Sequence, residues 1–279
     1  MKKLMVVMLT LCLACGADEV EQAGGTVSVL FLGKGENQPL IVGLGGSEGG
    51  NAWASLRSKA IRDMFVDQGY AFLAVGYFGA EGTPEKLDRV SIDKVHDTIE
   101  EALKDPKIAD DRIAVIGGSK GAELALLLGS HYTDVSCVVS VVGSHAAFPA
   151  LTFSASTSSW TYEGKEVPYV PANWASVPSI IKGNLRRAFE IMMEDTAAVD
   201  KALIQVEKIN GPILCVSASK DEMWPSTEMS SKVMKRLDDF HFPYVHQHII
   251  IQGDHNEPLD HFDQVLAFIT KNYPLIDHQ

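Results

Sequence analysis

The sequence predicts an α/β fold built on a mostly parallel, doubly wound sheet. From residue 26 onward, short apolar runs rich in Val and Ile alternate with longer segments whose apolar residues recur three and four positions apart. Near-continuous apolar runs are typical of strands buried on both faces, and the longer segments are typical of amphipathic helices that cover those faces. Hydrophobic residues make up 46% and charged residues 22% of the chain, as in ordinary globular proteins.

The predicted elements follow one another without internal repeats. The expected strands are the apolar runs at residues 26–32, 40–44, 71–77, 113–117, 136–142, 213–217 and 244–251. The expected helices are the amphipathic segments at residues 53–68, 90–104, 120–131, 226–240 and 259–273. Because strands and helices alternate, we expect helices on both faces of one sheet.

The stretch 144–198 interrupts this alternation. It is rich in Ser, Thr, Pro and aromatic residues and has no clean helical period until about residue 178. Long irregular segments in a compact domain usually carry function. We therefore expect one domain over residues 26–279, with 144–198 as a cap-like insertion over one edge of the sheet.

The first residues have the pattern of an export signal. Residues 1–3 (MKK) are cationic, residues 4–14 are apolar but too short for a permanent membrane span, and small residues follow at 14–17 (ACGA). We expect residues 1–17 to be a signal peptide and residues 18–25 to be a flexible tether.

The boundary at Cys15 resembles a bacterial lipoprotein processing site, where a lipidated Cys15 would attach the protein to a membrane. Cleavage after Gly16 or Ala17 is the alternative. Either route predicts export from the bacterial cytoplasm, to the periplasm or as a membrane-anchored lipoprotein.

Charge and cysteine usage exclude several classes of protein. The chain has 24 basic and 36 acidic residues and a net charge of −12, and no Lys/Arg cluster is longer than a pair such as Arg186-Arg187, which argues against a nucleic-acid partner. Cys137 and Cys215 lie in apolar runs, so buried packing is their expected role. A disulfide is the alternative if their strands are neighbours and the two residues match in height and face.

The sharpest local motif is G-x-S-x-G at residues 117–121 (GGSKG). An apolar strand is predicted before it and a helix after it, which is the context in which this motif places a serine nucleophile on a sharp turn. Small residues are needed on both sides of such a turn, and the N-terminus of the helix offers backbone N–H groups to a developing oxyanion. We expect Ser119 to be the nucleophile and the N–H of Lys120 to be one oxyanion donor.

A second glycine cluster follows an earlier strand, at residues 43–50 (GLGGSEGG). In serine hydrolases of this architecture, the corresponding loop supplies the other oxyanion donor. We expect the N–H of Ser47 in this role, with Gly46 and Glu48 as neighbouring choices. A phosphate-binding loop is the rival interpretation, but the cluster lacks the Lys-Ser/Thr ending of a P-loop and the G-x-G-x-x-G spacing of a dinucleotide site.

An acid and a base follow in the chain order that this fold requires. Asp221 lies just after the predicted strand 213–217, and His255 lies between the last strand and the last helix. We expect Asp221 to be the acid and His255 to be the general base, although Asp221 and Glu222 would otherwise read as solvated loop charges. His246 and His248 share one face of a strand, but a third metal ligand is not evident, so no metal and no cofactor are predicted.

Five separated segments resemble one protein family. They are residues 44–50 (LGGSEGG), 117–127 (GGSKGAELALL), 159–171 (SWTYEGKEVPYVP), 220–226 (KDEMWPS) and 253–258 (GDHNEP). Over roughly residues 26–273 they resemble the C-terminal catalytic domain of the acyl-CoA thioester hydrolase and bile acid-CoA:amino acid N-acyltransferase family. The resemblance implies an α/β-hydrolase fold in which Ser119, Asp221 and His255 are the nucleophile, acid and base. It also implies hydrolysis, because the family's N-acyltransferases carry Cys where this chain has Ser119.

The expected activity is cleavage of a small-molecule acyl thioester through an acyl-enzyme. Acyl-CoA as the substrate is inherited from the resemblance, whereas the serine hydrolase class also follows from the residues. The alternatives are an exported carboxylesterase, an acyltransferase to an amine, and a non-catalytic acyl-binding lipoprotein. For substrate contacts we expect Trp160 and Tyr162 in the insertion and Trp224 beside the acid. The other aromatic residues expected in the cap are Phe148, Phe153, Tyr169 and Trp174.

Overall fold

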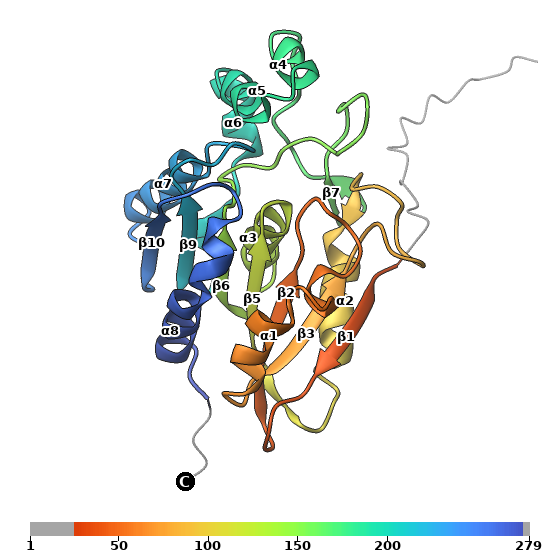
Figure 1. Cartoon of the computed structure of the whole chain (residues 1–279), viewed down its shortest axis with the longest axis vertical. Coiled ribbons are helices and arrows are strands. Elements are labelled where there is room, and N and C mark those ends of the chain that lie inside the picture. The colour runs from red at the N-terminus through yellow and green to blue at the C-terminus, as the bar shows by residue number, and fades with distance from the viewer. Residues whose placement is uncertain (1–24, 276–279) are drawn as a thin grey trace, which may run out of the picture.

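A computed structural model describes residues 25–275, in which seven strands form the central sheet. In spatial order, the strands are β1 (Val27–Phe31), β3 (Ala71–Gly76), β2 (Gln38–Leu44), β5 (Ile108–Gly118), β6 (Val135–Val141), β9 (Ile213–Ala218) and β10 (His246–Ile251). β1 pairs antiparallel with β3, and every other neighbour in this sheet is parallel. The expected doubly wound α/β fold is therefore present (Figure 1).

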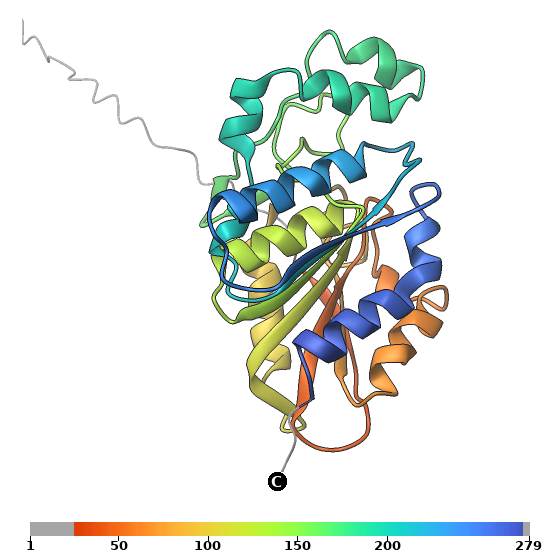
Figure 2. The same cartoon turned by 90° about the vertical axis from the view of Figure 1, so that its left-hand side faces the viewer.

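Helices cover both faces of the sheet. One face carries α2 (Ile92–Ala102), α3 (Lys120–His131) and α7 (Ser226–Asp239), and the other carries α1 (Lys59–Val66) and α8 (Phe262–Asn272) (Figure 2). Side chains of β2 alternate between these layers, because successive residues of a strand point to opposite faces. Leu40, Val42 and Leu44 join the first layer, while Ile41 joins the second.

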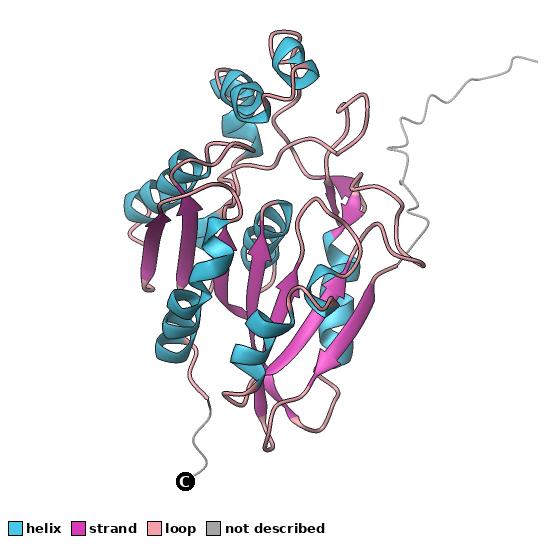
Figure 3. Cartoon of the chain, in the orientation of Figure 1, coloured by secondary structure: helices cyan, strands magenta, loops and turns pink. Residues whose placement is uncertain are grey.

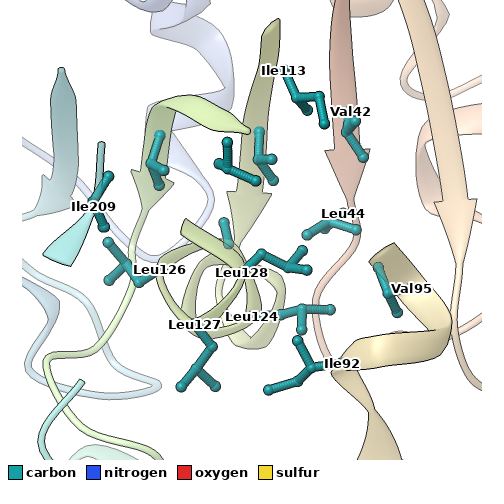
Figure 4. Packing of buried hydrophobic residues seen from close by; sticks show 14 of the residues in the cluster. Val42, Leu44, Ile92, Val95, Ile113, Leu124, Leu126, Leu127, Leu128 and Ile209 are labelled. Carbon is teal, nitrogen blue, oxygen red and sulfur yellow. The ribbon is translucent and has the colours of Figure 1, made fainter. Parts of the chain in front are cut away.

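The helix after the serine motif is the most deeply buried helix of the first layer. Leu124, Leu126, Leu127 and Leu128 belong to one buried cluster with Ile92 and Val95 of α2, Val42 and Leu44 of β2, and Ile209 (Figure 4). Each fully buried leucine side chain contributes about 1.5–3 kcal/mol to stability. This packing anchors the N-terminal end of α3, which directly follows Ser119.

The chain between β6 and β9 forms, over most of its length, the upper part of the molecule in Figure 1. It contains β7 (Trp160–Tyr162), β8 (Lys165–Glu166), α4 (Val177–Ile181), α5 (Leu185–Met192), α6 (Thr196–Ala202) and the 3-10 turn η2 (Val206–Lys208). β7 pairs with β4 (Val90–Ser91), which forms a small second sheet that the sequence did not predict. Helices α4 to α6 lie beyond the carboxyl ends of the main strands (Figure 3). We call residues 144–198 the insertion below.

Two predicted helices are shorter than expected. The segment 53–68 divides into a 3-10 turn η1 (Ala52–Ala54) and α1, because Ser55 and Ser58 hydroxyls donate to the carbonyl of Ala52 at 2.6 and 2.9 Å and end the first turn. The segment 259–273 likewise divides into the 3-10 turn η3 (Glu257–His261) and α8.

The two described cysteines are free and buried. Cys137 on β6 and Cys215 on β9 belong to cores on opposite faces of the sheet, and Cys215 lies opposite Ser140 in the register of the two strands. A disulfide would require matching height and face, so the packing role is the one that the geometry fits. Burial raises the pKa of both thiols to about 12.

The expected signal peptide and Cys15 lie outside the described residues, as does nearly all of the expected tether. Across residues 25–275, no helix has the length and hydrophobicity that a membrane crossing requires.

Candidate active site

Ser119 occupies a sharp turn between β5 and α3. Its backbone has φ 52° and ψ −116°, in a region that residues with a side chain rarely adopt. Its N–H donates to the carbonyl of Val141 on the neighbouring strand at 2.9 Å, and this bond helps to hold the turn. Strain of this kind persists only where the surrounding structure enforces it, and it is frequent at functional sites.

The flanking glycines leave room for this turn. A Cβ atom at Gly117 would lie 2.0 Å from the carbonyl oxygen of Gly121, and a Cβ at Gly121 would lie 2.2 Å from that of Gly45. Real Cβ atoms do not approach backbone this closely, so both positions require glycine. The spacing G-x-S-x-G therefore reflects how closely α3 approaches both its own strand and the loop after β2.

The second glycine cluster lies against the serine. A Cβ at Gly46 would lie 3.2 Å from the Cβ of Ser119, while the side chains of Ser47 and Glu48 are exposed. The structure thus brings the loop after β2, the serine and the first residue of α3, Lys120, together at one point. Backbone N–H donors from such a loop and from a helix N-terminus are what an oxyanion site requires.

The predicted acid and base meet. The Nδ1 atom of His255, in the loop after β10, lies 2.8 Å from Oδ1 of Asp221, in the loop after β9. Asp221 is 1% exposed, and the same oxygen accepts the backbone N–H groups of Met223 and Trp224 at 3.0 and 3.2 Å. A carboxylate fixed in this way can orient the imidazole and stabilise its protonated form.

Glu222, for which a solvated loop charge was the other interpretation, is exposed and contacts a different part of His255. Its Oε2 accepts the backbone N–H of His255 at 3.1 Å rather than a ring nitrogen. From the insertion, Nη1 of Arg186 on α5 donates to the carbonyl of Asp221 at 2.8 Å, and its backbone N–H donates to that of Glu222 at 3.2 Å. The loop that carries Asp221 and Glu222, called the acid loop below, is therefore held by hydrogen bonds to His255 and to Arg186 that the sequence did not predict.

Two of the aromatic residues expected to contact substrate are buried. The indole N–H of Trp160 donates to Oε1 of Glu123 at 2.6 Å, and that of Trp224 donates to the carbonyl of Val142 at 2.8 Å. Their side chains are 0% and 2% exposed, which fits core packing better than direct contact with substrate.

Tyr162 lies elsewhere. Its ring stacks on His131 with centroids 3.9 Å apart, at the C-terminal end of α3, whereas Ser119 precedes the N-terminal end. A helix of 12 residues is about 18 Å long, so the structure does not bring Tyr162 to the serine. Among the other aromatics of the insertion, Phe153 and Trp174 are the ones whose side chains are most exposed.

The two strand histidines have separate partners. His246 contacts Asp238 at 2.9 Å, and His248 contacts the hydroxyl of Ser217 at 2.7 Å. Within the described part of the chain, no group of three His, Cys, Asp or Glu side chains is placed to hold a metal ion.

Glu123 was not predicted as a site residue from the sequence. It lies one turn after Ser119 on α3, and its carboxylate is completely buried. Lys120 and Glu123 have the i, i+3 spacing that is typical of an exposed ion pair, so the burial of Glu123 was not expected. Only the apolar residues on every side of α3 indicated that this helix has no solvent-facing surface.

Known proteins share both the sequence pattern and the fold. A family model described as "BAAT / Acyl-CoA thioester hydrolase C terminal" matches residues 92–254, which is more than half of the chain. The peroxisomal succinyl-coenzyme A thioesterase of Mus musculus is 27% identical over 228 residues, covering 81% of this chain and 51% of that protein. The bile acid-CoA:amino acid N-acyltransferase of Mus musculus is 25% identical over 210 residues, covering 75% and 46%. The chain thus spans about half the length of these relatives.

Solved structures agree on the architecture. A puromycin-hydrolyzing peptidase of Mycobacterium tuberculosis superposes with a TM-score of 0.61 at 16% identity, covering 93% of this chain and 40% of that chain. The α/β hydrolase GrgF from Penicillium superposes with a TM-score of 0.55 at 12% identity, covering 88% and 98%. These similarities confirm the expected α/β-hydrolase fold.

Proposed function

The chain belongs to the BAAT / acyl-CoA thioester hydrolase C-terminal family, and from that premise we propose that it is a serine hydrolase that transfers the acyl group of a thioester to water. The observation that carries the proposal is the strained backbone of Ser119. This residue directly precedes α3 and lies beside Gly46 in the loop after β2. A hydroxyl at a helix N-terminus, flanked by a glycine loop, suits attack on a carbonyl carbon.

The proposed first half-reaction forms an acyl-enzyme. His255 takes the hydroxyl proton of Ser119 at Nε2 while the oxygen attacks the acyl carbon, and Asp221 stabilises the imidazolium through Nδ1. The carbonyl oxygen becomes an oxyanion, which accepts N–H groups of Lys120 and of the loop at 45–48. One well-placed donor of this kind contributes about 3 kcal/mol to transition-state stabilisation. When the carbon–sulfur bond breaks, the imidazolium proton passes to the leaving sulfur.

The second half-reaction releases the acid. Water gives a proton to His255 as its oxygen attacks the acyl carbon, and the proton returns to Ser119 when the ester bond breaks. The carboxylic acid and the free serine are then the products. In this proposal the insertion, residues 144–198, supplies the wall of the acyl site above the strand ends.

Acyl transfer to an amine is the second candidate, because relatives of both kinds are named in this family. Hydrolysis is favoured because Ser119 stands where the resemblance implies Cys in the N-acyltransferases. A carboxylesterase acting on oxygen esters would use the same groups in the same order.

The experiment measures thiol release from acyl-CoA esters of graded chain length by residues 18–279, in parallel with p-nitrophenyl esters and a Ser119→Ala control. Thioester turnover that is lost in the control supports the proposal. Turnover of oxygen esters alone indicates a carboxylesterase, and a new amide product with added glycine indicates an acyltransferase. No turnover that depends on Ser119 would favour an acyl-binding protein without catalytic activity.

We further propose that the protein is exported and anchored through Cys15. The apolar run 4–14, the cationic start and the small residues at 14–17 support this proposal. The intact mass of the protein extracted from membranes of an expressing bacterium tests it. A lipid adduct on Cys15 is expected, whereas a chain that begins at Ala17 or Asp18 would show ordinary signal cleavage.

A further inference from the structure

Four donors surround the buried carboxylate of Glu123. Oε1 accepts from Lys120 Nζ at 2.9 Å, Trp160 Nε1 at 2.6 Å and the N–H of Phe148 at 3.2 Å, and Oε2 accepts from Ser144 Oγ at 3.1 Å. A buried carboxylate is costly unless it is paired and hydrogen-bonded. Three of these donors belong to the insertion, so the carboxylate joins the insertion to α3.

On one side, Glu123 fixes the residue that follows the serine. The side chain of Lys120 is 4% exposed, and its ammonium donates to both Glu123 and the carbonyl of Phe148. Burial lowers the pKa of this lysine, and the nearby carboxylate opposes that shift. Two acceptors therefore hold the side chain of Lys120 in place. The same residue provides the backbone N–H that is one expected oxyanion donor.

On the other side, Trp160 reaches the glycine loop through Tyr77. The ring centroids of Trp160 and Tyr77 are 5.7 Å apart, and the hydroxyl of Tyr77 donates to the carbonyl of Gly45 at 2.5 Å. Tyr77 is 2% exposed and directly follows β3. Burial raises the pKa of Tyr77 well above its usual value, and the charges of Glu48 and Glu123 add to this, so its hydroxyl remains a donor.

The same carbonyl of Gly45 also faces Gly121, whose Cβ would lie 2.2 Å from it. The loop after β2 is therefore held between α3 and the hydroxyl of Tyr77. A small displacement of this loop would move the N–H groups of Gly46 and Ser47 relative to that of Lys120.

We infer that Tyr77, Trp160 and Glu123 are positioning residues that hold the two halves of the oxyanion site at a fixed separation. The inference rests on the proposed function. Oxyanion donors stabilise the transition state only when they are pre-positioned within a few tenths of an ångström, so a buried chain of contacts between the two halves serves catalysis directly. It also makes the insertion a structural component of the oxyanion site, through Trp160, Ser144 and Phe148.

The test compares two tyrosines at opposite ends of β3. Tyr70 directly precedes the strand, is fully buried and donates its hydroxyl to the carbonyl of Tyr273 at 2.9 Å, far from Ser119. Tyr70→Phe and Tyr77→Phe therefore remove the same group from similar burial. The readouts are the melting temperature and the rate at which a fluorophosphonate, which needs the oxyanion site, labels Ser119 in residues 18–279.

We expect both variants to lose similar stability and only Tyr77→Phe to label slowly, by about 10-fold, which is less than the loss of a whole oxyanion donor. Trp160→Phe, which keeps an aromatic ring but removes the N–H, should slow labelling in the same way. With a turned-over substrate, the loss should appear in kcat with KM nearly unchanged, because the interaction exists only in the transition state.

Equal labelling rates for Tyr77→Phe and Tyr70→Phe, with the wild type labelled normally, would overturn the inference and leave the proposed function intact. A wild-type protein whose Ser119 is not labelled would instead overturn the proposed function.

Discussion

The imidazole of His255 and the carboxylate of Asp221 are joined by a hydrogen bond of 2.8 Å, although 34 residues separate them in sequence. Each follows one of two adjacent parallel strands, β9 and β10, whose carboxyl ends lie at the same edge of the sheet. A buried acceptor at Nδ1 favours the tautomer that carries its proton there. The other ring nitrogen, Nε2, is then an acceptor and suits a general base.

Replacing this acid with its amide should abolish most of the activity without unfolding the protein. Asp221→Asn keeps the shape of the side chain but can present an N–H to Nδ1 and so favour the wrong tautomer, and kcat should fall on the order of 10³–10⁴-fold. The matched control is Asp254→Asn, an exposed acid one residue before His255 whose Oδ1 accepts the N–H of Asn256. Comparable kcat values for the two variants in thiol release would contradict the assignment of Asp221.

The glycines of the serine turn should differ sharply in their tolerance of alanine. A Cβ at Gly117 would meet the backbone of Gly121 at 2.0 Å, whereas a Cβ at Gly118 has nothing within 4 Å. Gly117→Ala should destabilise the protein by about 1–3 kcal/mol or more, as overpacked core substitutions do. Gly118→Ala should stay within about 0.5 kcal/mol of wild type. Denaturant unfolding of both variants provides the comparison, and equal free energies of unfolding would refute this explanation of the motif.

Two adjacent arginines on α5 allow a contact that supports the acid loop to be compared with an ordinary surface charge. Both pair with Glu190, but Arg186 also donates to the carbonyl of Asp221, whereas Arg187 also pairs with Glu194. Arg186→Gln should lower kcat about 10-fold, because a charged hydrogen bond of roughly 1.5–3 kcal/mol is lost from the loop. Arg187→Gln should leave kcat near wild type, since exposed ion pairs contribute little. If both variants lost activity equally, the insertion would not act through the acid loop.

His145 predicts a loss of stability in mild acid. It is 4% exposed, and neither ring nitrogen has a partner among the described residues. Burial, together with the charge of Lys232, lowers its pKa from 6.5 to about 3. Between these values the unfolded chain binds a proton that the folded protein does not, so stability is fully present above pH 6.5 and falls as the pH is lowered.

The size of this effect is at most about 1.4 kcal/mol per pH unit for one proton. Urea unfolding at pH 7, 6 and 5 measures it, and the pH dependence of the free energy of unfolding should be shallower in His145→Gln than in wild type. The same slope in both proteins would show that His145 does not cause the acid sensitivity.

The sequence predicted those parts of the molecule that depend on local pattern. The apolar runs located every strand of the main sheet, and the glycine spacing placed Ser119 at a turn, because strand burial and turn geometry act over a few residues. The meeting of Asp221 and His255 was also predictable, since parallel strands bring their carboxyl ends to one edge. The antiparallel pairing of β1 was not predicted, because an apolar run does not reveal its direction.

The contacts that support the site could not be predicted from the sequence. Glu123 and Trp160 are 37 residues apart and come from different elements, α3 and β7, whose contact no local pattern predicts. Lysine is usually a surface residue, whereas Lys120 is buried and donates to the carbonyl of Phe148 in the insertion. Likewise, Trp160 and Trp224 were expected to contact substrate but lie in the core. The sequence pattern around an aromatic residue outside regular elements does not distinguish core packing from a place in the wall of a site.

The most direct test of the proposed mechanism is the intact mass of the protein after rapid mixing with a short-chain acyl-CoA and acid quenching. We expect a species heavier by one acyl group, with the adduct on the peptide that contains Ser119, and no such species and almost no thiol release in Ser119→Ala. Thiol release by Ser119→Ala at the wild-type rate, with no acyl group on Ser119 in the wild-type protein, would contradict the proposed mechanism.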